Sequence, residues 1–556
     1  MNVAKRAQLA IVLLLAVFAL LAFRLAQIQV FAADEYRSAG DRQRTRVQSL
    51  PHPRGEIRDA RGVPIAYSEP GFELWAEPGL LEKPEAVARD IAAAIGEDDA
   101  EVLARFWQAR DRVLVARGLS IEQAEAVRDI AVRGLKLDEG FRRVYRLDAA
   151  SSHVLGFVGR DGKGLEGLEY VWEQVLAGKP GRRMVLSDAR NRSIDLGDGH
   201  TTPGLPGANL DITIDGALQR VVHEEMERGA ERLRPRSGAA VVMDPRTGDV
   251  TALVSWPTYL PEERGRTSPE VARNRAVQDA YEPGSTFKPL VFGWALDRWV
   301  VKRGEIIDCE NGAWRAIGSR VIHDTHAMGR VPLETGLVKS SNVMAAKIGR
   351  RLGAERLHEC VTSFGFGSRT GVGLPGEASG IVGPRTTWSP HTVLSVPFGQ
   401  ELAVTPLQLV TGYAALVNGG LKMRPRLIRR LIGSDGEVLR EYPCAEGERL
   451  LKESTSAWLR TTLRRVVEEG TGKRARIPGR AVGGKTGTAQ KYERDPATGR
   501  MRVSKTKYVA SFVGFAPADD PTMVCAVVWD EPKGSIYGGS AAAPVVKRII
   551  ARAFGW

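Results

Sequence analysis

The sequence predicts an α+β protein with an N-terminal transmembrane helix and two folded domains, the second built on an antiparallel sheet covered by helices. Three observations support this prediction: an apolar run at the N-terminus, a break in periodicity near residue 200, and strand-like runs at both ends of the C-terminal part. At 556 residues, the chain exceeds the length at which a single hydrophobic core stops growing. We therefore expect one domain at 32–198 and another at 211–556, joined by a linker at 199–210.

The N-terminal run, residues 7–23, is apolar except for Gln8, and as a helix it spans about 25 Å. Arg24 can snorkel to the membrane interface, and the apolar stripe after it extends the run. No small-residue cleavage site follows directly, so we expect an uncleaved anchor and not a signal peptide. Residues 1–8 then form a cytoplasmic tail and residues 9–31 cross the membrane, because basic residues before a span stay on the cytoplasmic side.

The first domain, 32–198, mixes short strand-like pieces with one largely helical, charged stretch at 83–127. Apolar residues recur there mostly at helical spacings, namely Val87, Ile91, Ile95, Val102, Leu103 and Phe106. We expect an α+β pedestal domain. The Gly- and Pro-rich stretch 197–209 breaks both helical and strand periodicity, which is typical of an interdomain linker.

The second domain is expected to pack both of its ends on one antiparallel sheet. Its first part has an apolar helix face (Leu218, Val221, Val222, Met226 and Leu233) followed by two strand-like runs, 239–243 and 250–256. Its last part has two more strand-like runs and a closing helix, at 508–515, 523–529 and 543–554. Helices that cover an antiparallel sheet define the α+β class.

The net charge of +13 suits three kinds of partner: nucleic acid, a membrane surface, or an anionic matrix such as a cell wall. Lys and Arg are spread along the chain and do not form one basic block with interleaved aromatics, and no nucleic-acid-binding motif occurs. We therefore expect no nucleic-acid partner.

The four cysteines form no CxxC pair and are expected to be buried, unpaired thiols. A bridge between Cys309 and Cys360 stays open as an alternative, because only geometry limits pairing outside the cytoplasm. The segment His323-Asp-Thr-His326 contains residue types that bind zinc, but its spacing matches no standard zinc pattern. We expect it to form turns and loop hydrogen bonds, and we expect no metal or other cofactor.

The segment Ser285-Thr-Phe-Lys288 places a serine and a lysine one helical turn apart. It follows the turn-forming Tyr281-Glu-Pro-Gly284 and precedes an apolar stretch, so Ser285 is expected to open a buried helix with Pro289 in its first turn. A desolvated lysine loses its proton more easily and can activate a neighbouring hydroxyl. Because about one or two S-x-x-K matches are expected by chance, the second one, Ser504–Lys507, is interpreted as accidental.

Two further motifs follow in order. Ser340-Ser-Asn342 supplies a second hydroxyl and an amide after a helix-like stretch at 333–338. Lys485-Thr-Gly-Thr488 reads as a strand whose glycine lets a ligand backbone approach closely. About 0.1 K-T-G matches are expected by chance in this length. The ordered trio is the one found in penicillin-binding proteins and class A β-lactamases.

Other phrases accompany the trio along the chain: Arg54-Gly-Glu-Ile-Arg-Asp59-Ala-Arg-Gly62, Gly164-Leu-Glu166-Gly-Leu-Glu169, Leu176-Ala-Gly178, Phe398-Gly-Gln400, Val404-Thr-Pro-Leu-Gln408, Asn418-Gly-Gly420 and Val482-Gly-Gly-Lys-Thr-Gly-Thr-Ala-Gln490. With the trio, they resemble class B penicillin-binding proteins over nearly the whole chain, closest to the division-specific transpeptidases of the FtsI type. Residues 32–198 would then be the dimerisation-type pedestal, and 211–556 the penicillin-binding transpeptidase domain. A class A enzyme would need a glycosyltransferase domain, for which the pedestal lacks the length and the acidic motif.

The resemblance implies a peptidoglycan D,D-transpeptidase. Ser285 would attack the carbonyl between the last two D-alanines of a stem peptide, and an amino group of a neighbouring stem would resolve the acyl-enzyme without a cofactor. β-Lactams would acylate Ser285 and be released slowly. The implied roles are: Lys288 as base; Ser340 with Lys485 as proton relay; Asn342 at the substrate amide; Thr486, Gly487 and Thr488 around the terminal carboxylate; and the backbone N–H groups of Ser285 and Thr488 as oxyanion hole.

The resemblance also implies a single-pass protein of the inner membrane with its catalytic domain on the periplasmic side, acting in septal wall synthesis. Its anchor and pedestal would pair with a glycan polymerase of the FtsW type and other division proteins. Pedestal charges would then form buried interdomain ion pairs or take part in activation, and we favour the structural role for them: Arg54, Glu56, Arg58, Asp59 and Glu166.

Other functions share the same trio. A β-lactamase, a carboxypeptidase or a β-lactam sensor is disfavoured, because a soluble hydrolase needs neither an anchor nor a pedestal. An elongation-type class B enzyme with the same chemistry is the main alternative to a septal one. A scaffold with a degenerate site is disfavoured by the intact motifs. The polar segment 491–507 is expected to be a mobile hairpin loop beside the site.

Overall fold

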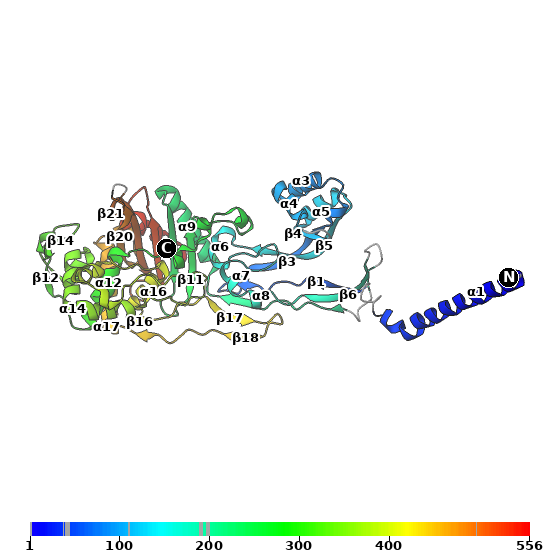
Figure 1. Ribbon diagram of the computed structural model, residues 1–556. Coiled ribbons are helices and arrows are strands. Elements are labelled where there is room, and N and C mark those ends of the chain that lie inside the picture. Colours follow the sequence, from blue (N-terminus) through cyan, green and yellow to red (C-terminus); the bar gives the residue numbers. More distant parts are fainter. Residues whose placement is uncertain are drawn as a thin grey trace.

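The computed structural model describes residues 3–36, 38, 45–108, 112–187, 193–195, 201–495 and 498–556. Figure 1 shows an elongated molecule, with the helix α1 (Val3–Ala26) at one end, the pedestal strands in the middle and the C-terminal domain at the other end. α1 continues as one π-helical turn, η1 (Gln27–Phe31), and none of these residues is buried. By length and composition, Val3–Phe31 can cross a membrane, as predicted for the N-terminal run.

The pedestal and part of the C-terminal domain share one large sheet. Its order is β18-β17-β9-β2-β3-β4, with β5 also paired to β3. The long central strands β3 and β5 pair from Ala66 opposite Tyr145 to Ala76 opposite Leu135. The bounds are β2 (Ile57–Arg58), β3 (Pro64–Ala76), β4 (Val113–Leu119), β5 (Leu135–Tyr145), β9 (Asn209–Ile212), β17 (Ile428–Ile432) and β18 (Val438–Glu441).

The prediction of one largely helical stretch at 83–127 is wrong in its middle. Helices α3 (Pro84–Ile95), α4 (Asp99–Phe106) and α5 (Ile121–Asp129) occupy most of it, but 113–119 forms β4. Gly96 ends α3 in a left-handed conformation, and β4 pairs with β3. The apolar residues of β4 and of these helices form one cluster against the sheet. A strand must bury its apolar face just as a helix must, so the apolar pattern did not distinguish β4 from the helices around it.

A smaller sheet lies at the end of the pedestal nearer α1 in Figure 1 and contains β1 (Thr45–Leu50), β6 (Gly181–Ser187), β7 (Ser193–Asp195) and β8 (Thr201–Thr202). The segment expected as a linker is therefore partly built into sheets: β8 pairs with β6, and β9 begins at Asn209. β9 is parallel to β2 and antiparallel to β17. The junction between the two domains is thus a continuous piece of sheet.

The C-terminal domain is built on a five-stranded antiparallel sheet of order β11-β10-β22-β21-β20. α9 (Gly216–Leu233) and α19 (Ala543–Phe554) pack on one face, and helices that include α16 (Pro406–Val417) pack on the other. The interior strand β10 is buried along its whole length for this reason. The predicted α+β class is confirmed. The strand bounds are β10 (Ser237–Met243), β11 (Val250–Trp256), β20 (Gly483–Arg494), β21 (Met501–Ala516) and β22 (Met523–Asp530).

The remaining α-helices are divided between the pedestal, which contains those before residue 198, and the C-terminal domain, which contains the others. They are α6 (Ser152–Leu155), α7 (Gly167–Val171), α8 (Glu173–Leu176), α10 (Pro269–Ala272), α11 (Arg275–Gln278), α12 (Lys288–Asp297), α13 (Leu333–Val338), α14 (Asn342–Ser363), α15 (Pro390–Ser395), α17 (Glu453–Glu468) and α18 (Gly538–Ala541). Short strand pairs complete the domain: β12 (Ile306–Asp308) with β15 (Arg330–Pro332), β13 (Ala313–Ile317) with β14 (Arg320–His323), and β16 (Leu421–Lys422) with β19 (Glu448–Arg449).

Polar contacts hold the pedestal together and fix it to the C-terminal domain. Glu169 is fully buried and bridges Arg54 and Arg143, with Nε–Oε distances of 2.6 and 2.8 Å. Across the junction, Glu166 accepts hydrogen bonds from Arg264 at 2.6 Å and from the Tyr259 hydroxyl at 3.0 Å.

Other charges of the first motif also have partners. Asp59 accepts a hydrogen bond from the backbone N–H of Gly216 at the start of α9, at 3.1 Å. Arg58 donates to Glu56 at 2.8 Å. Arg54, Asp59 and Glu166 therefore make buried or interdomain contacts, as the structural role favoured for them requires, whereas Arg58 and Glu56 pair locally with each other.

Candidate active site

Ser285 lies in η6 (Gly284–Phe287), a 3₁₀ turn that leads directly into the buried helix α12. The predicted helix start is confirmed. Ser285 itself is half-buried, whereas its neighbours in the turn are buried. Two contacts hold the turn: the Gly284 N–H donates to the Gly399 carbonyl at 3.0 Å, and the Tyr413 hydroxyl donates to the Thr286 carbonyl at 2.6 Å. The serine hydroxyl is thus presented at the surface of a rigid turn.

Lys288 projects from the first turn of α12 into a fully buried environment. Its Nζ donates hydrogen bonds to the Ser340 carbonyl at 2.6 Å, to Asn342 Oδ1 at 2.7 Å and to Ser340 Oγ at 3.1 Å. Burial lowers the pKa of Lys288 well below its ordinary value, and the nearby charge of Lys485 lowers it further, while Asp324 acts in the opposite direction. A neutral amine at this position can accept a proton.

Lys485 reaches the same hydroxyl from the sheet. It belongs to β20, is fully buried, and donates to Ser340 Oγ at 3.0 Å. Burial lowers the pKa of Lys485 to about 7. Ser340 has a φ of +66°, a left-handed conformation that is uncommon for a serine and concentrates at functional sites. Two buried lysines therefore meet at one hydroxyl, and burial lowers the pKa of both.

Asp324 is a site residue that the sequence reasoning did not single out. It lies in the segment considered for zinc, but its carboxylate caps α14: it accepts from the Asn342 and Val343 N–H groups, and from Ser341 Oγ at 2.7 Å. The His323 carbonyl accepts from Asn342 Nδ2 at 2.8 Å. The segment thus positions Asn342 through loop hydrogen bonds, as expected. Within the described ranges, no three His, Cys, Asp or Glu side chains form a group suited to a metal ion.

The thiols need one correction. All four cysteines are free, so Cys309 and Cys360 are not bridged. Cys309, Cys360 and Cys525 are buried as expected, but Cys444 is exposed. It lies in an irregular segment between β18 and β19, where no sheet face covers it.

Thr486, Gly487 and Thr488 continue β20, which is the edge strand of the five-stranded sheet. An edge strand leaves one row of backbone N–H and C=O groups for a ligand. Thr486 Oγ1 lies 2.7 Å from Thr471 Oγ1, and Thr488 Oγ1 accepts from the Gly538 N–H at 3.2 Å. A Cβ on Gly487 would lie 2.4 Å from Ser511 Oγ and 2.9 Å from the Pro283 carbonyl. Only glycine allows β20 to pack this closely against the Ser285 turn.

The motif residues are therefore brought together in one place. Lys288, Ser340, Asn342 and Lys485 share one hydrogen-bond network. η6, which carries Ser285, packs directly on β20. The second S-x-x-K match, Ser504–Lys507, lies in β21 and has no helix.

The segment 491–507 does form a hairpin, but β20 and β21 remain paired as far as Arg494 opposite Met501. The unpaired part of this segment is therefore shorter than expected.

Comparisons with known proteins agree with this geometry. The family model described as the penicillin-binding protein transpeptidase domain matches residues 238–551, and the penicillin-binding protein dimerisation domain matches residues 49–212. The chain is 32% identical to the probable peptidoglycan D,D-transpeptidase PenA of Neisseria gonorrhoeae, over 96% of this chain and 89% of PenA. It is also 32% identical to the peptidoglycan D,D-transpeptidase FtsI of Escherichia coli, over 97% and 89% of the two chains.

Two further similarities extend this picture. Stage V sporulation protein D of Bacillus subtilis is 32% identical, over 99% of this chain and 85% of that protein. The crystal structure of penicillin-binding protein 3 of Mycobacterium tuberculosis in complex with aztreonam superposes with a TM-score of 0.70 at 26% identity, covering 91% and 97% of the two chains. Both domain families match in order along the chain, and relatives at 32% identity cover nearly all of it. The chain therefore belongs to the class B penicillin-binding proteins.

Proposed function

We propose that this protein is a serine-type peptidoglycan D,D-transpeptidase that cross-links stem peptides through an acyl-enzyme on Ser285. The observation that carries the proposal is the meeting of Lys288 and Lys485, both buried and with lowered pKa, at the hydroxyl of Ser340 beside the Ser285 turn. Family membership and the names of the relatives support the same reaction.

The first half of the reaction uses the neutral amine of Lys288. It removes the proton of the Ser285 hydroxyl as Oγ bonds to the carbonyl carbon between the last two D-alanines. The bond from that carbon to the terminal D-alanine nitrogen then breaks, and the departing nitrogen takes a proton through Ser340 and Lys485. D-Alanine leaves and the rest of the donor stem stays esterified to Ser285.

The edge strand β20 supplies the substrate contacts. The charge of Lys485 and the hydroxyls of Thr486 and Thr488 are suited to the terminal carboxylate. The backbone N–H groups of Ser285 and Thr488 are suited to the oxyanion, because η6 and β20 pack together. Asn342, held by Lys288 and the α14 cap, is suited to the substrate amide.

The cellular setting belongs to the same proposal. Similarity to FtsI of E. coli, together with the resemblance of the motifs to the division-specific FtsI type, favours a septal role beside a glycan polymerase of the FtsW type, with pedestal and anchor as the contact surfaces. The equally similar sporulation protein of B. subtilis and the elongation-type class B enzymes are the alternatives. The two basic residues of the tail, Lys5 and Arg6, favour a cytoplasmic N-terminus and a periplasmic catalytic domain. Depletion in the host organism separates these roles: filaments indicate division and rounded cells indicate elongation.

The test of the chemistry is intact-mass spectrometry of the full chain in detergent with benzylpenicillin. We expect a stable increase of one whole drug molecule in the wild type and none in Ser285→Ala. Ser504→Ala, at the accidental S-x-x-K match, is the matched control and should be acylated normally. Rapid turnover of the drug would indicate a β-lactamase, and no adduct on a folded wild type would refute the proposal.

A further inference from the structure

A cavity of about 500 Å³ lies between the five-stranded sheet and the start of α16, and its lining includes residues next in sequence to the Ser285 turn and to Thr488. Two of its walls are direct continuations of the motifs: residues 279–282 precede Gly284 and Ser285, and residues 489–492 follow Thr488 on β20. Small apolar side chains, among them Ala239, Ala403 and Val509, form part of its lining. The volume falls within the range of about 300–1,000 Å³ that is typical of ligand sites.

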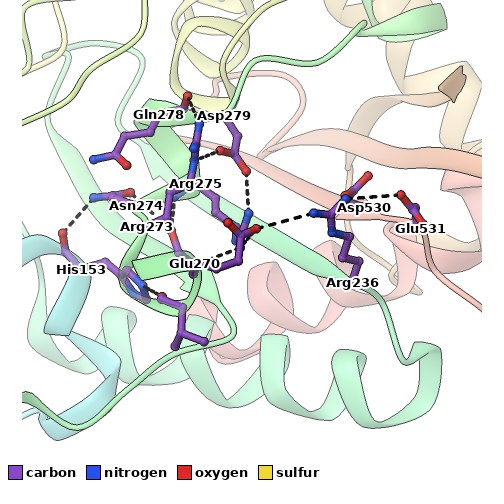
Figure 2. A network of polar contacts seen from close by, with 12 residues as sticks. His153, Arg236, Glu270, Arg273, Asn274, Arg275, Gln278, Asp279, Asp530 and Glu531 are labelled. Carbon is purple, nitrogen blue, oxygen red and sulfur yellow. Dashed lines mark hydrogen bonds and ion pairs between the residues drawn. The ribbon is translucent and has the colours of Figure 1, made fainter. Parts of the chain in front are cut away.

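Most of the charges that line this cavity are already neutralised. Glu270 and Asp279 both pair with Arg275, at 3.0 and 2.9 Å, and Figure 2 shows this guanidinium between the two carboxylates. Asp530 pairs with Lys491 at 2.7 Å. These contacts satisfy the groups within the protein, so none of them requires a ligand.

Glu282 differs from the other carboxylates of the cavity. Among the residues that the structure describes, no cation lies within ion-pair distance of it, and its Oε1 accepts only the Glu401 N–H at 2.9 Å. Burial raises the pKa of Glu282, and the charge of Glu401 adds to this effect. A half-buried carboxylate without a counter-ion is costly, and a bound cation removes that cost. Glu282 is also three residues from Ser285.

We propose that this cavity is the acceptor subsite and that Glu282 binds the ammonium group of the incoming stem peptide. The inference rests on the proposed transpeptidase function. Once D-alanine has left, the reaction needs an amine, which at neutral pH arrives mostly protonated. The ammonium releases one proton to solvent, the neutral amine attacks the ester carbonyl, the C–N bond forms and the C–Oγ bond breaks. The second amine proton returns to Ser285 Oγ, so that an amide and the free serine result.

The charge of Glu282 suits the amine of an acceptor peptide and not the carboxylate at the end of the donor peptide. The donor terminus carries a carboxylate, which suits Lys485 and would be repelled by Glu282. At the rim of the cavity, Arg236 is mostly exposed and makes only loose contacts, 3.9 Å to Glu270 and 3.8 Å to Glu531 (Figure 2). It can therefore turn to a carboxylate of the acceptor chain. The ligand class is a peptide with one free amine and at least one carboxylate.

The test uses the full chain in detergent with a D-alanyl thioester as donor, and titrates a tetrapeptide that carries a side-chain amine. Aminolysis is measured against hydrolysis of the acyl-enzyme. In Glu282→Gln, we expect the acceptor concentration for half-maximal aminolysis to rise at least tenfold, with Ser285 still acylated by benzylpenicillin. Glu231→Gln, on the exposed side of α9, is the matched control and should aminolyse like the wild type.

A second variant keeps the proposal testable if Glu282→Gln does not fold. Tyr492→Lys, at a half-exposed position across the cavity, offers Glu282 an internal cation and should weaken acceptor use in the same way. Normal aminolysis in a folded Glu282→Gln, or loss of penicillin acylation in it, would overturn the acceptor assignment. Failure of the wild type to be acylated would instead refute the proposed function.

Discussion

Lys485 donates a hydrogen bond of 3.0 Å to the Ser340 hydroxyl from a fully buried position at which its pKa has fallen to about 7. No carboxylate pairs with this lysine among the described residues. Burying the Lys485 ammonium without a counter-ion destabilises the folded protein. The substrate carboxylate would supply the missing negative charge when it binds.

Replacing Lys485 by Met should raise the free energy of unfolding at pH 7 by about 1–4 kcal/mol, because a buried cation is removed. The folded chain holds this proton more weakly than the unfolded chain does. The penalty is therefore fully present below pH 7 and is lost as the pH rises towards the ordinary lysine pKa of about 10.4. Thermal denaturation should show a larger gain in Tm at pH 7 than at pH 9.5. Equal gains would contradict this account, and the variant should form no penicillin adduct.

Asp324→Ala should slow acylation by benzylpenicillin at least tenfold, because Asn342 and the start of α14 lose the carboxylate that positions them. The lost cap should also cost about 0.5–2 kcal/mol of stability. Asp98→Ala is the matched control, since Asp98 caps α4 in the pedestal through Ala100 and Glu101. It should lose similar stability and keep its acylation rate. If both variants were acylated equally fast, Asp324 would only stabilise the start of α14 and would not position Asn342 for the reaction.

Glu169→Gln should destabilise the chain by about 3–5 kcal/mol, because it leaves the buried guanidinium groups of Arg54 and Arg143 without their shared carboxylate. Chemical denaturation measures this loss. In Glu69→Gln, the half-exposed pair with Arg142 is removed instead, and the change should stay below about 1 kcal/mol. A normal stability with slowed acylation in Glu169→Gln would show that this cluster controls activity and not folding.

Gly487→Ala should reduce the acylation rate at least a hundredfold. The new methyl group would meet Ser511 and the backbone of Pro283, and would force β20 away from the turn that carries Ser285. Gly79→Ala is the control, because a Cβ there has nothing within 4 Å. Stopped-flow acylation with a chromogenic β-lactam compares the two. Retention of the wild-type rate by Gly487→Ala would mean that this close packing is not needed for chemistry.

Local pattern was enough to predict the elements that carry the motifs. Pro289 and the apolar residues after Ser285 indicated a helix start, and Lys485 was expected on a strand, because both signals lie within a few residues of the motif. Likewise, the runs that became β10 and β22 were long and apolar, since helices cover both faces of their sheet. These patterns involve residues that are only a few positions apart, so they can be recognised in a single sequence.

Long-range partners were not predictable in the same way. Asp324 is 18 residues from Asn342, and nothing in its neighbourhood distinguishes a cap of a distant helix from a turn or a metal ligand. The strand at Val113–Leu119 was missed because its residues fall between helices, and only its pairing with β3 makes it a strand. Pairing of Arg54 with Glu169, 115 residues away, is another contact that only the fold reveals.

The sheet that joins β2, β9 and β17 has a mechanical consequence. Strand pairing links the pedestal to the catalytic domain: the Leu210 N–H donates to the Glu56 carbonyl at 2.8 Å, and Leu210 on β9 lies opposite Leu431 on β17. Any movement of one domain relative to the other would therefore have to bend or break this shared sheet. The distance from the base of the pedestal to Ser285 is therefore set by the folded structure and not by a flexible linker.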